Sequence, residues 1–240
     1  MIALACVLAI GPVPRPVVDE VKIPGTVASV TLVRIPADPP YWMSATEITW
    51  DAYDPYAFRF DLTQEEQAAG VDAASRPSKP YGAPDKGFGH TGYPALGITF
   101  HSAEQYCAWL SRKTGRKFRL PTEREWDFAA RAGARGEGDI DKVAWYWDNT
   151  EDKTQPVGKL APNAYGLYDM LGNVQEWAID KDGKPVTCGG SYRDKRPQIK
   201  FSQRAYQIPK WNENDPQIPK SRWWLSNAPY VGFRVVAEPD

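Results

Sequence analysis

The chain has 240 residues, of which 42% are hydrophobic and 25% charged, so it can bury a core and wholesale disorder is excluded. Twenty-nine basic and thirty acidic residues leave a formal charge of −1, which excludes a broad electrostatic attraction to nucleic acid or to an anionic membrane. The length favours one domain, residues 19–240, and the ten Trp, twelve Tyr, 22 Pro and 19 Gly are typical of a loop-rich architecture.

Residues 1–18 begin with an apolar run, MIALACVLAI, that is followed by turn residues. The run has the length of a signal-peptide core, although no Lys or Arg precedes it. It also suits a buried N-terminal strand over residues 2–10. Export to the periplasm or the extracellular space is therefore one expectation, and a cytoplasmic protein is the other. No segment approaches the ~18 apolar residues that a membrane span requires, so no span is expected.

Short strands are expected along the whole chain. β-Branched residues predict one over residues 27–35, and a second is expected over residues 45–50, followed by a helical turn at 50–56. Clusters of Gly, Pro and Ser over residues 63–91 indicate a long surface loop. The remaining strand candidates are residues 155–158, 176–179, 187–192 and 230–236.

Two capping boxes mark the two main helices. Ser102 and Gln105 can satisfy each other's backbone amides at the start of the first helix, and Thr122 and Glu125 can do so for the second. Glycine can adopt the left-handed conformation that ends a helix. The glycines expected to end these helices are Gly115 and Gly133.

Four segments carry Gly, Trp and Asn in a fixed order. They are RLPTEREWDFAARAG at 119–133, PVGKLAPNAYGLYDMLGNVQEW at 156–177, CGGSYRD at 188–194 and VGFRVV at 231–236, and YCAWLSRKTGRKF at 106–118 extends the pattern upstream. In order and spacing they resemble the formylglycine-generating enzyme, or sulfatase-modifying factor, family. The resemblance implies an α+β, C-type-lectin-like fold with two main helices, short strands and much irregular loop, which agrees with the composition.

An acidic turn offers a candidate metal site. Asp169 and Glu176 lie seven residues apart around Gly172, so a loop could direct two carboxylates and intervening carbonyls at one hard cation. Such a turn can equally be solvated. The resemblance implies a structural Ca²⁺ held by the side chains of Asp169 and Glu176 and by the carbonyls of Gly172 and Val174.

The family's oxidases use two cysteines shortly after a Gly-Gly-Ser motif, where the thiolates bind Cu(I) and engage a substrate cysteine. Counted from the motif at 189–191, the matching positions hold Asp194 and, approximately, Ile199, and neither side chain replaces a thiolate. Two nearby positions also depart from the family, with Gln175 in place of a Trp and Gln207 in place of a frequent Arg. Copper-dependent oxidation is therefore not expected.

The remaining metal-binding residues are few. Cys6, Cys107 and Cys188 provide neither a disulfide framework nor zinc-site spacing, and Cys107 is expected to be a buried, inert thiol. A site with two histidines and one carboxylate would require His90 and His101 to converge with an acid, and iron is therefore not expected.

Two groups of residues are candidates for binding. Residues 206–224 mix aromatic and polar groups without periodicity, which is typical of either a packed loop or a recognition surface. The candidate ligand contacts there are Trp211, Asn212, Arg222 and Trp223. The candidate pocket residues are Gln175, Ser191, Arg193 and Asp194.

The leading hypothesis is a divergent family domain without cysteine-to-formylglycine oxidase activity. It would act as a calcium-stabilised module that binds a protein, peptide or small-molecule ligand. The alternative is a metal-dependent oxidase of the non-haem iron or copper type that uses a rebuilt pocket, with Ser191, Arg193 and Asp194 as its first candidate residues.

Overall fold

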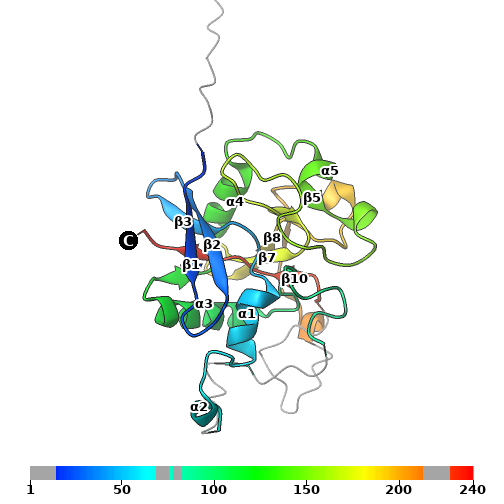
Figure 1. Cartoon of the computed structure of the whole chain (residues 1–240). Helices are drawn as coiled ribbons and strands as arrows, with labels where there is room; N and C mark the ends of the chain where they lie inside the picture. The colour runs from blue at the N-terminus through cyan, green and yellow to red at the C-terminus, as the bar shows by residue number, and fades with distance from the viewer. Residues whose placement is uncertain (1–14, 69–75, 78–82, 213–227, 240) are drawn as a thin grey trace, which may run out of the picture.

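Two β-sheets and the helices beside them organise the chain (Figure 1). The computed structural model describes residues 15–68, 76–77, 83–212 and 228–239. In this part of the chain, the larger sheet has the strand order β1-β2-β3-β11-β4 and the smaller one β10-β7-β8-β9, while β5 and β6 form a separate parallel pair. The α+β class with much irregular loop is confirmed.

The strands are β1 (Val18–Lys22), β2 (Ser29–Ile35), β3 (Tyr41–Ser44), β4 (Phe118–Arg119), β5 (Ala144–Trp145), β6 (Leu171–Gly172), β7 (Gln175–Ile179), β8 (Pro185–Cys188), β9 (Arg204–Ala205), β10 (Val231–Gly232) and β11 (Val236–Ala237). The helices are α1 (Trp50–Ala57), α2 (Gln64–Ala68), α3 (Phe100–Thr114), α4 (Glu123–Arg131) and α5 (Ile140–Val143). Short 3₁₀ helices lie at Trp147–Asn149, Arg196–Gln198 and Pro209–Asn212. None of the described helices combines the length and apolar character needed to cross a membrane.

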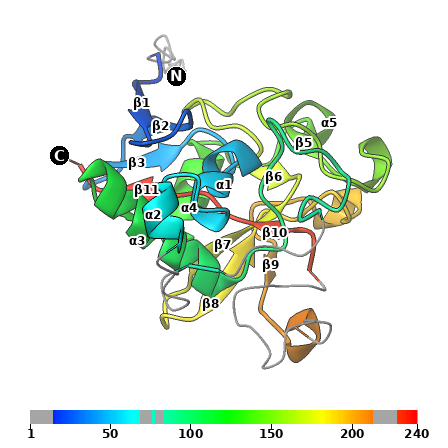
Figure 2. The same cartoon turned by 60° about the horizontal axis from the view of Figure 1, so that its bottom comes forward.

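Strand β2 of the larger sheet carries buried side chains on both of its faces. Along β2, Leu32 belongs to a hydrophobic cluster with α1 and α3, whereas its neighbour Val33 belongs to a second cluster with α4. Successive side chains of a strand point to opposite faces, so β2 contributes to both cores. The C-terminal strand β11 lies between β3 and β4, which brings the two ends of the domain into one sheet (Figures 1 and 2).

Local capping chemistry places the two main helices. Thr122 and Glu125 form the predicted capping box of α4, and Gly115, with φ 75°, ends α3 as expected. The predicted start of α3 at Ser102 is wrong. Thr99 is the N-cap and its side chain accepts a hydrogen bond from the Ser102 amide, so the helix begins at Phe100. Helix α4 ends with Ala132 as its C-cap, one residue before the predicted Gly133.

Some of the predicted strands coincide with hydrogen-bonded strands of the structure, and others do not. Residues 27–35 contain β2, residues 176–179 lie within β7, and residues 50–56 lie within α1. Residues 45–50 contain no strand, because β3 has already ended at Ser44. Residues 155–158 also form none, and the Gln155 amide donates to the side chain of Asn173 instead. Strand β8 ends at Cys188, because the glycines that follow adopt φ values of 91° and 76°. Residues 230–236 hold the short β10 and the start of β11.

Residues 83–93 are held on α1 by His90. Its Nε2 lies 2.7 Å from Asp54 Oδ2 and its Nδ1 lies 3.0 Å from Asp85 Oδ2, while its ring stacks on Trp50 with centroids 5.5 Å apart. The same segment carries Phe88, whose ring contacts Tyr192 with centroids 5.7 Å apart. His90 therefore positions the aromatic side chain that lies beside the Gly-Gly-Ser turn.

The charge of His90 should make this attachment dependent on pH. Burial alone would lower the pKa of His90, but the hydrogen bonds to Asp54 and Asp85 outweigh it and raise the pKa above 6.5. A raised folded-state pKa gives stability that is complete below the unfolded value and is lost as pH rises through the folded value. Replacement of His90 by Gln should destabilise the protein by at most about 1 kcal/mol at pH 6 and by less at pH 9, because the pair is partly exposed.

Denaturant unfolding at the two pH values and an NMR titration of the His90 ring provide the measurement. Equal destabilisation at both pH values, or a His90 pKa below 6.5, would contradict this assignment.

Candidate functional site

The Gly-Gly-Ser turn directly follows β8 and brings the two positions of the expected cysteine pair together. A Cβ placed on Gly190 would lie 3.0 Å from Ile199 Cδ1 and 3.5 Å from Asp194 Oδ2. Gly190 also has a φ of 76°, which glycine adopts without strain. The side chains of Asp194 and Ile199, the two positions counted as matching the family's catalytic pair, thus both lie next to one glycine.

A hydrogen-bonded network occupies the place next to this pair. Asp194 Oδ2 accepts from the Ser191 amide at 2.8 Å, from the Ser191 hydroxyl at 3.0 Å and from Gln175 Nε2 at 3.3 Å. Gln175 Oε1 accepts from the Thr187 hydroxyl at 2.7 Å. Ser191, Gln175 and Thr187 are buried, and Asp194 is half-buried. The polar groups of this network thus hydrogen-bond to one another. The Ser191 hydroxyl donates to a carboxylate and is not activated by a histidine.

Aromatic and basic side chains form the outer edge of the same site. Trp147 is 43% exposed, and its amide donates to the Asp194 carbonyl at 3.0 Å. Lys195 Nζ lies 6.0 Å from the Trp147 ring centre, and the Arg193 guanidinium lies 5.5 Å from that of Tyr230. Sequence reasoning identified Arg193 but missed Trp147 and Tyr230, because only the fold brings them next to residues 191–195.

None of the candidate ligand contacts in residues 206–224 is seen as an exposed side chain in the part of the chain that the structure describes. Trp211 is buried, and its ring packs on Trp177 and Tyr230 with centroid distances of 5.9 Å and 6.0 Å. It belongs to the core and is not an exposed recognition residue. Asn212 ends a 3₁₀ helix, and Arg222 and Trp223 lie outside the described residues.

The two cysteines in the described part of the chain are free and buried. Burial raises the pKa of both the Cys107 and the Cys188 thiol, so neither is a reactive thiolate. The expectation of a buried thiol at Cys107 is confirmed. Cys6 lies outside the described residues.

The predicted calcium ligand Glu176 is already paired. Arg234 donates to Glu176 Oε2 through Nε and to Oε1 through Nη2, both at 2.6 Å, and Trp126 Nε1 donates to Oε2 at 2.6 Å. Both charged side chains are almost completely buried. A metal ion at Glu176 would have to displace this guanidinium, so Glu176 does not fit as a ligand in this arrangement.

Asp169 fits a cation better than Glu176 does. Its Oδ2 accepts from the Gly158 amide at 2.6 Å, and its buried Oδ1 has no hydrogen-bond partner. A third carboxylate, Glu47, accepts from Asn173 Nδ2 and from the Val174 amide at 2.7 Å and 3.0 Å.

The two predicted carbonyl ligands, Gly172 and Val174, lie on either side of Asn173 in the tight turn between β6 and β7. A Cβ on Gly172 would lie 2.1 Å from the Trp145 carbonyl oxygen, so the turn packs closely on β5. Across the described residues, no three His, Cys, Asp or Glu side chains are grouped as a metal site. The predicted set contains two carboxylates and two backbone carbonyls, so it stays a prediction. Elsewhere, His90 is engaged by two aspartates.

Comparison with known proteins supports the family. The model of the sulfatase-modifying factor enzyme 1-like domain matches residues 20–239. A protein from Bos taurus named inactive C-alpha-formylglycine-generating enzyme 2 is 35% identical over 129 residues, which cover 42% of this chain and 39% of that protein. The formylglycine-generating enzyme of Thermomonospora curvata is 32% identical over 113 residues, covering 37% of this chain and 33% of the enzyme. The chain thus spans less than two fifths of the length of these relatives.

Solved structures share the fold at low identity. Treponema denticola variable protein 1 superposes with a TM-score of 0.65 at 21% identity, covering 93% of this chain and all of that one. PvdO from Pseudomonas aeruginosa superposes with a TM-score of 0.54 at 22% identity, covering 94% of this chain and 92% of that one. Together with the family match over most of its length, these findings show that the chain belongs to the sulfatase-modifying factor enzyme 1-like domain family.

Proposed function

We propose that this chain is a ligand-binding domain of its family that does not convert cysteine to formylglycine. The observation that carries the proposal is the identity of the two side chains that meet over Gly190. Asp194 offers only oxygen and Ile199 offers no donor atom, whereas Cu(I) requires soft sulfur ligands. The Asp194 oxygen facing Gly190 also accepts three hydrogen bonds, so it is not available as a base in this arrangement.

The similarity to a bovine protein named inactive C-alpha-formylglycine-generating enzyme 2 supports a non-catalytic role. A relative from Paenibacillus barcinonensis that is 34% identical over 100 residues is named chaperone protein LppX, which also fits a role in contacting other molecules. These alignments cover 39% and 36% of the two relatives, so their functions enter here only as support.

The binding surface we propose is the outer edge of the site, formed by Trp147, Arg193, Lys195 and Tyr230. Tyr, Trp and Arg dominate the energetics of binding surfaces, because they combine a large apolar area with few flexible bonds. The Asp194 carboxylate oxygen is turned toward Ser191 and Gln175, which leaves Arg193 and Lys195 as the nearest charged groups of this segment on the outside. A peptide or small molecule with an anionic group and an apolar or aromatic group would suit this surface.

Calcium stabilisation stays a prediction. The unpartnered oxygen of Asp169 supports a cation nearby, but Glu176 is occupied by Arg234. We therefore propose that the guanidinium, and not a metal ion, supplies the positive charge at Glu176. No part of the proposed binding function depends on calcium.

Location also stays open to test. Cleavage of the signal-like segment, residues 1–18, would indicate export. A chain that keeps this segment would favour a cytoplasmic location. The intact mass of the protein from its native source separates the two.

Introducing the missing thiols should restore copper binding. The variant with Asp194→Cys and Ile199→Cys places two sulfurs over Gly190, and we expect it to take Cu(I) from a chromogenic chelator, while the parent and the single Asp194→Cys variant do not. The parent should consume no oxygen with a cysteine-containing peptide, with or without copper. Oxygen consumption by the parent would instead support the metal-dependent oxidase, and failure of the double variant to bind Cu(I) would contradict the placement of the pair.

Removing the exposed indole should weaken ligand binding. On an array of random peptides probed with the full chain, we expect Trp147→Ala to lower binding about tenfold or more, a typical loss for a central interface aromatic. Phe128 on α4 is a matched control, because it is 42% exposed, against 43% for Trp147. Equal losses for Trp147→Ala and Phe128→Ala, or no binding by the parent, would contradict the proposed surface.

A further inference from the structure

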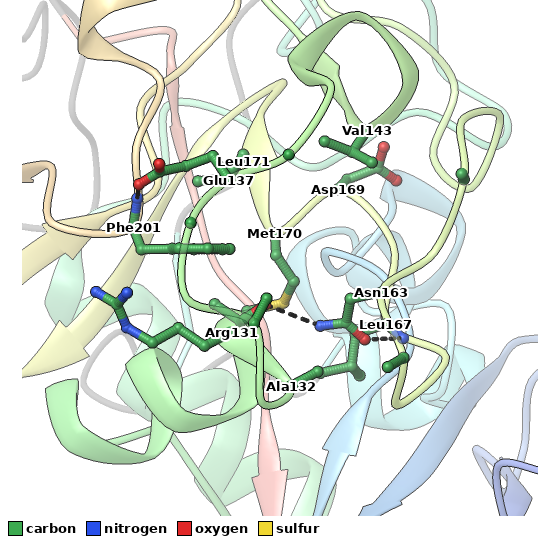
Figure 3. A pocket seen from close by; sticks show the side chains of 16 residues that line it. Arg131, Ala132, Glu137, Val143, Asn163, Leu167, Asp169, Met170, Leu171 and Phe201 are labelled. Atoms are coloured by element: carbon green, nitrogen blue, oxygen red, sulfur yellow. Dashed lines mark hydrogen bonds between the residues drawn. The ribbon is translucent and has the colours of Figure 1, made fainter. Parts of the chain in front are cut away.

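A cavity outside the site described above combines apolar walls with one buried carboxylate. It lies between the C-terminal end of α4, the loop that follows α4, and the turn before β6, and its volume is about 210 Å³. Its apolar walls include Ala130, Val143, Leu167, Met170, Leu171 and Phe201, and Asp169 lines the same cavity (Figure 3). An apolar cavity of about 150 Å³ binds benzene, so this one has room for a benzene-sized body and a few further atoms.

The protein satisfies only one oxygen of the Asp169 carboxylate. Asp169 is 3% exposed, and its Oδ2 accepts from the Gly158 amide at 2.6 Å. Its Oδ1 is also buried but has no hydrogen-bond partner. A buried polar atom without a partner is costly, and a charged one more so. Asp169 Oδ1 therefore favours an occupant of the cavity that supplies a hydrogen-bond donor.

The other polar side chains around the cavity already have partners. Asn163 donates to two carbonyls of α4 at 2.7 Å and 3.1 Å. Arg131 donates to a carboxylate of the same helix at 2.8 Å, and in Figure 3 its guanidinium points away from the cavity. Glu137 accepts from the Phe201 amide at 3.0 Å. Among the described residues that line the cavity, Asp169 thus provides the one buried side-chain atom that needs a donor.

The charges near Asp169 favour a donor that is a cation. Glu47 and Glu176 are also buried, and the carboxylates of both repel that of Asp169. The Arg234 guanidinium hydrogen-bonds to Glu176 and to two backbone carbonyls, and none of these bonds reaches Asp169. Three buried carboxylates thus share one guanidinium, and a second positive charge at Asp169 Oδ1 would reduce the remaining repulsion.

We propose that this cavity binds a small monoamine in its ammonium form. The ammonium group would donate to Asp169 Oδ1, and an aromatic or branched aliphatic body would fill the space between the apolar walls. A bare metal ion gains nothing from those walls, and a hydrocarbon leaves Oδ1 unpaired, whereas an amphipathic cation satisfies both features. Benzylamine and isoamylamine represent the class. The site is separate from the outer edge at Trp147, and the inference does not depend on the proposed function.

Benzylammonium is the probe, and benzyl alcohol is its neutral counterpart with the same ring. In calorimetric titrations of the full chain at pH 8 in EDTA, we expect benzylammonium to bind at least about tenfold more tightly than benzyl alcohol, because its hydrogen bond to the carboxylate is charge-assisted. Equal affinities for the two compounds, or no binding of benzylammonium, would overturn the proposal.

A methionine in the cavity wall reports where the probe binds. The sequence contains three methionines, Met1, Met43 and Met170, and Met170 lines the cavity. In a chain with ¹³C-labelled methionine methyl groups, the aromatic ring of benzylammonium should shift the Met170 signal and leave that of the buried Met43 in place. The Met170 signal is identified by its absence from the Met170→Leu spectrum. A shift confined to Met1 or Met43 would mean that the probe binds elsewhere and would overturn the proposal.

Two substitutions separate the effect of the carboxylate from that of the space. Asp169→Asn keeps the size of the side chain and an acceptor for Gly158, so benzylammonium should then bind no more tightly than benzyl alcohol. Val143→Phe fills part of the cavity and should weaken both compounds at least about tenfold. Val27→Phe, at a fully exposed valine, is the matched control and should weaken neither. Melting temperatures verify that the variants are folded, and unchanged binding in both cavity variants would contradict the proposed site.

Excess Ca²⁺ distinguishes an organic cation from a metal ion at Asp169. The affinity for benzylammonium and the shift of the Met170 signal should be the same in EDTA and in excess Ca²⁺. Displacement of benzylammonium by Ca²⁺ would overturn the proposal, because the free oxygen of Asp169 would then belong to a metal site.

Discussion

The ion pair of Arg234 with Glu176 is the interaction on which the arrangement of both sheets depends. Arg234 lies between β10 and β11, and besides its two bonds to Glu176 on β7 it donates to the carbonyls of Ser44 and Tyr168 at 3.0 Å and 2.9 Å. One guanidinium thus connects the smaller sheet, the end of β3 and the turn before β6. A buried charge that loses its partner costs several kcal/mol, so the loss of this pair would destabilise all three of these regions.

The candidate site takes its geometry from this pair. Glu176 is opposite Cys188 in the register of β7 and β8, which fixes where the Gly-Gly-Ser turn begins. Gln175 precedes Glu176 and lies on the other face of the strand, where it reaches Asp194. The same scaffold that could present two thiolates over Gly190 here presents a carboxylate and an aliphatic side chain. The family fold is therefore retained while its chemistry at this position is changed.

Features encoded by neighbouring residues were predictable from the sequence, and features made by distant residues were not. The α4 capping box needs only Thr122 and Glu125, whereas the start of α3 was misplaced because Thr99 and Ser102 are both good caps three residues apart. The spacing after the Gly-Gly-Ser motif pointed to Asp194 and Ile199, and both side chains lie next to Gly190. The pairing of Glu176 with Arg234, 58 residues apart, had no sequence signal, because only the fold brings β7 next to the segment between β10 and β11.

The most direct test of this account is a double-mutant cycle on the central ion pair, measured by denaturant unfolding in EDTA and in excess Ca²⁺. The account predicts that Arg234→Met and Glu176→Gln each cost about 3–5 kcal/mol, that the double variant loses clearly less than their sum, and that this coupling is the same in both buffers. Additive losses in the cycle, or coupling that is present in EDTA and absent in excess Ca²⁺, would contradict it.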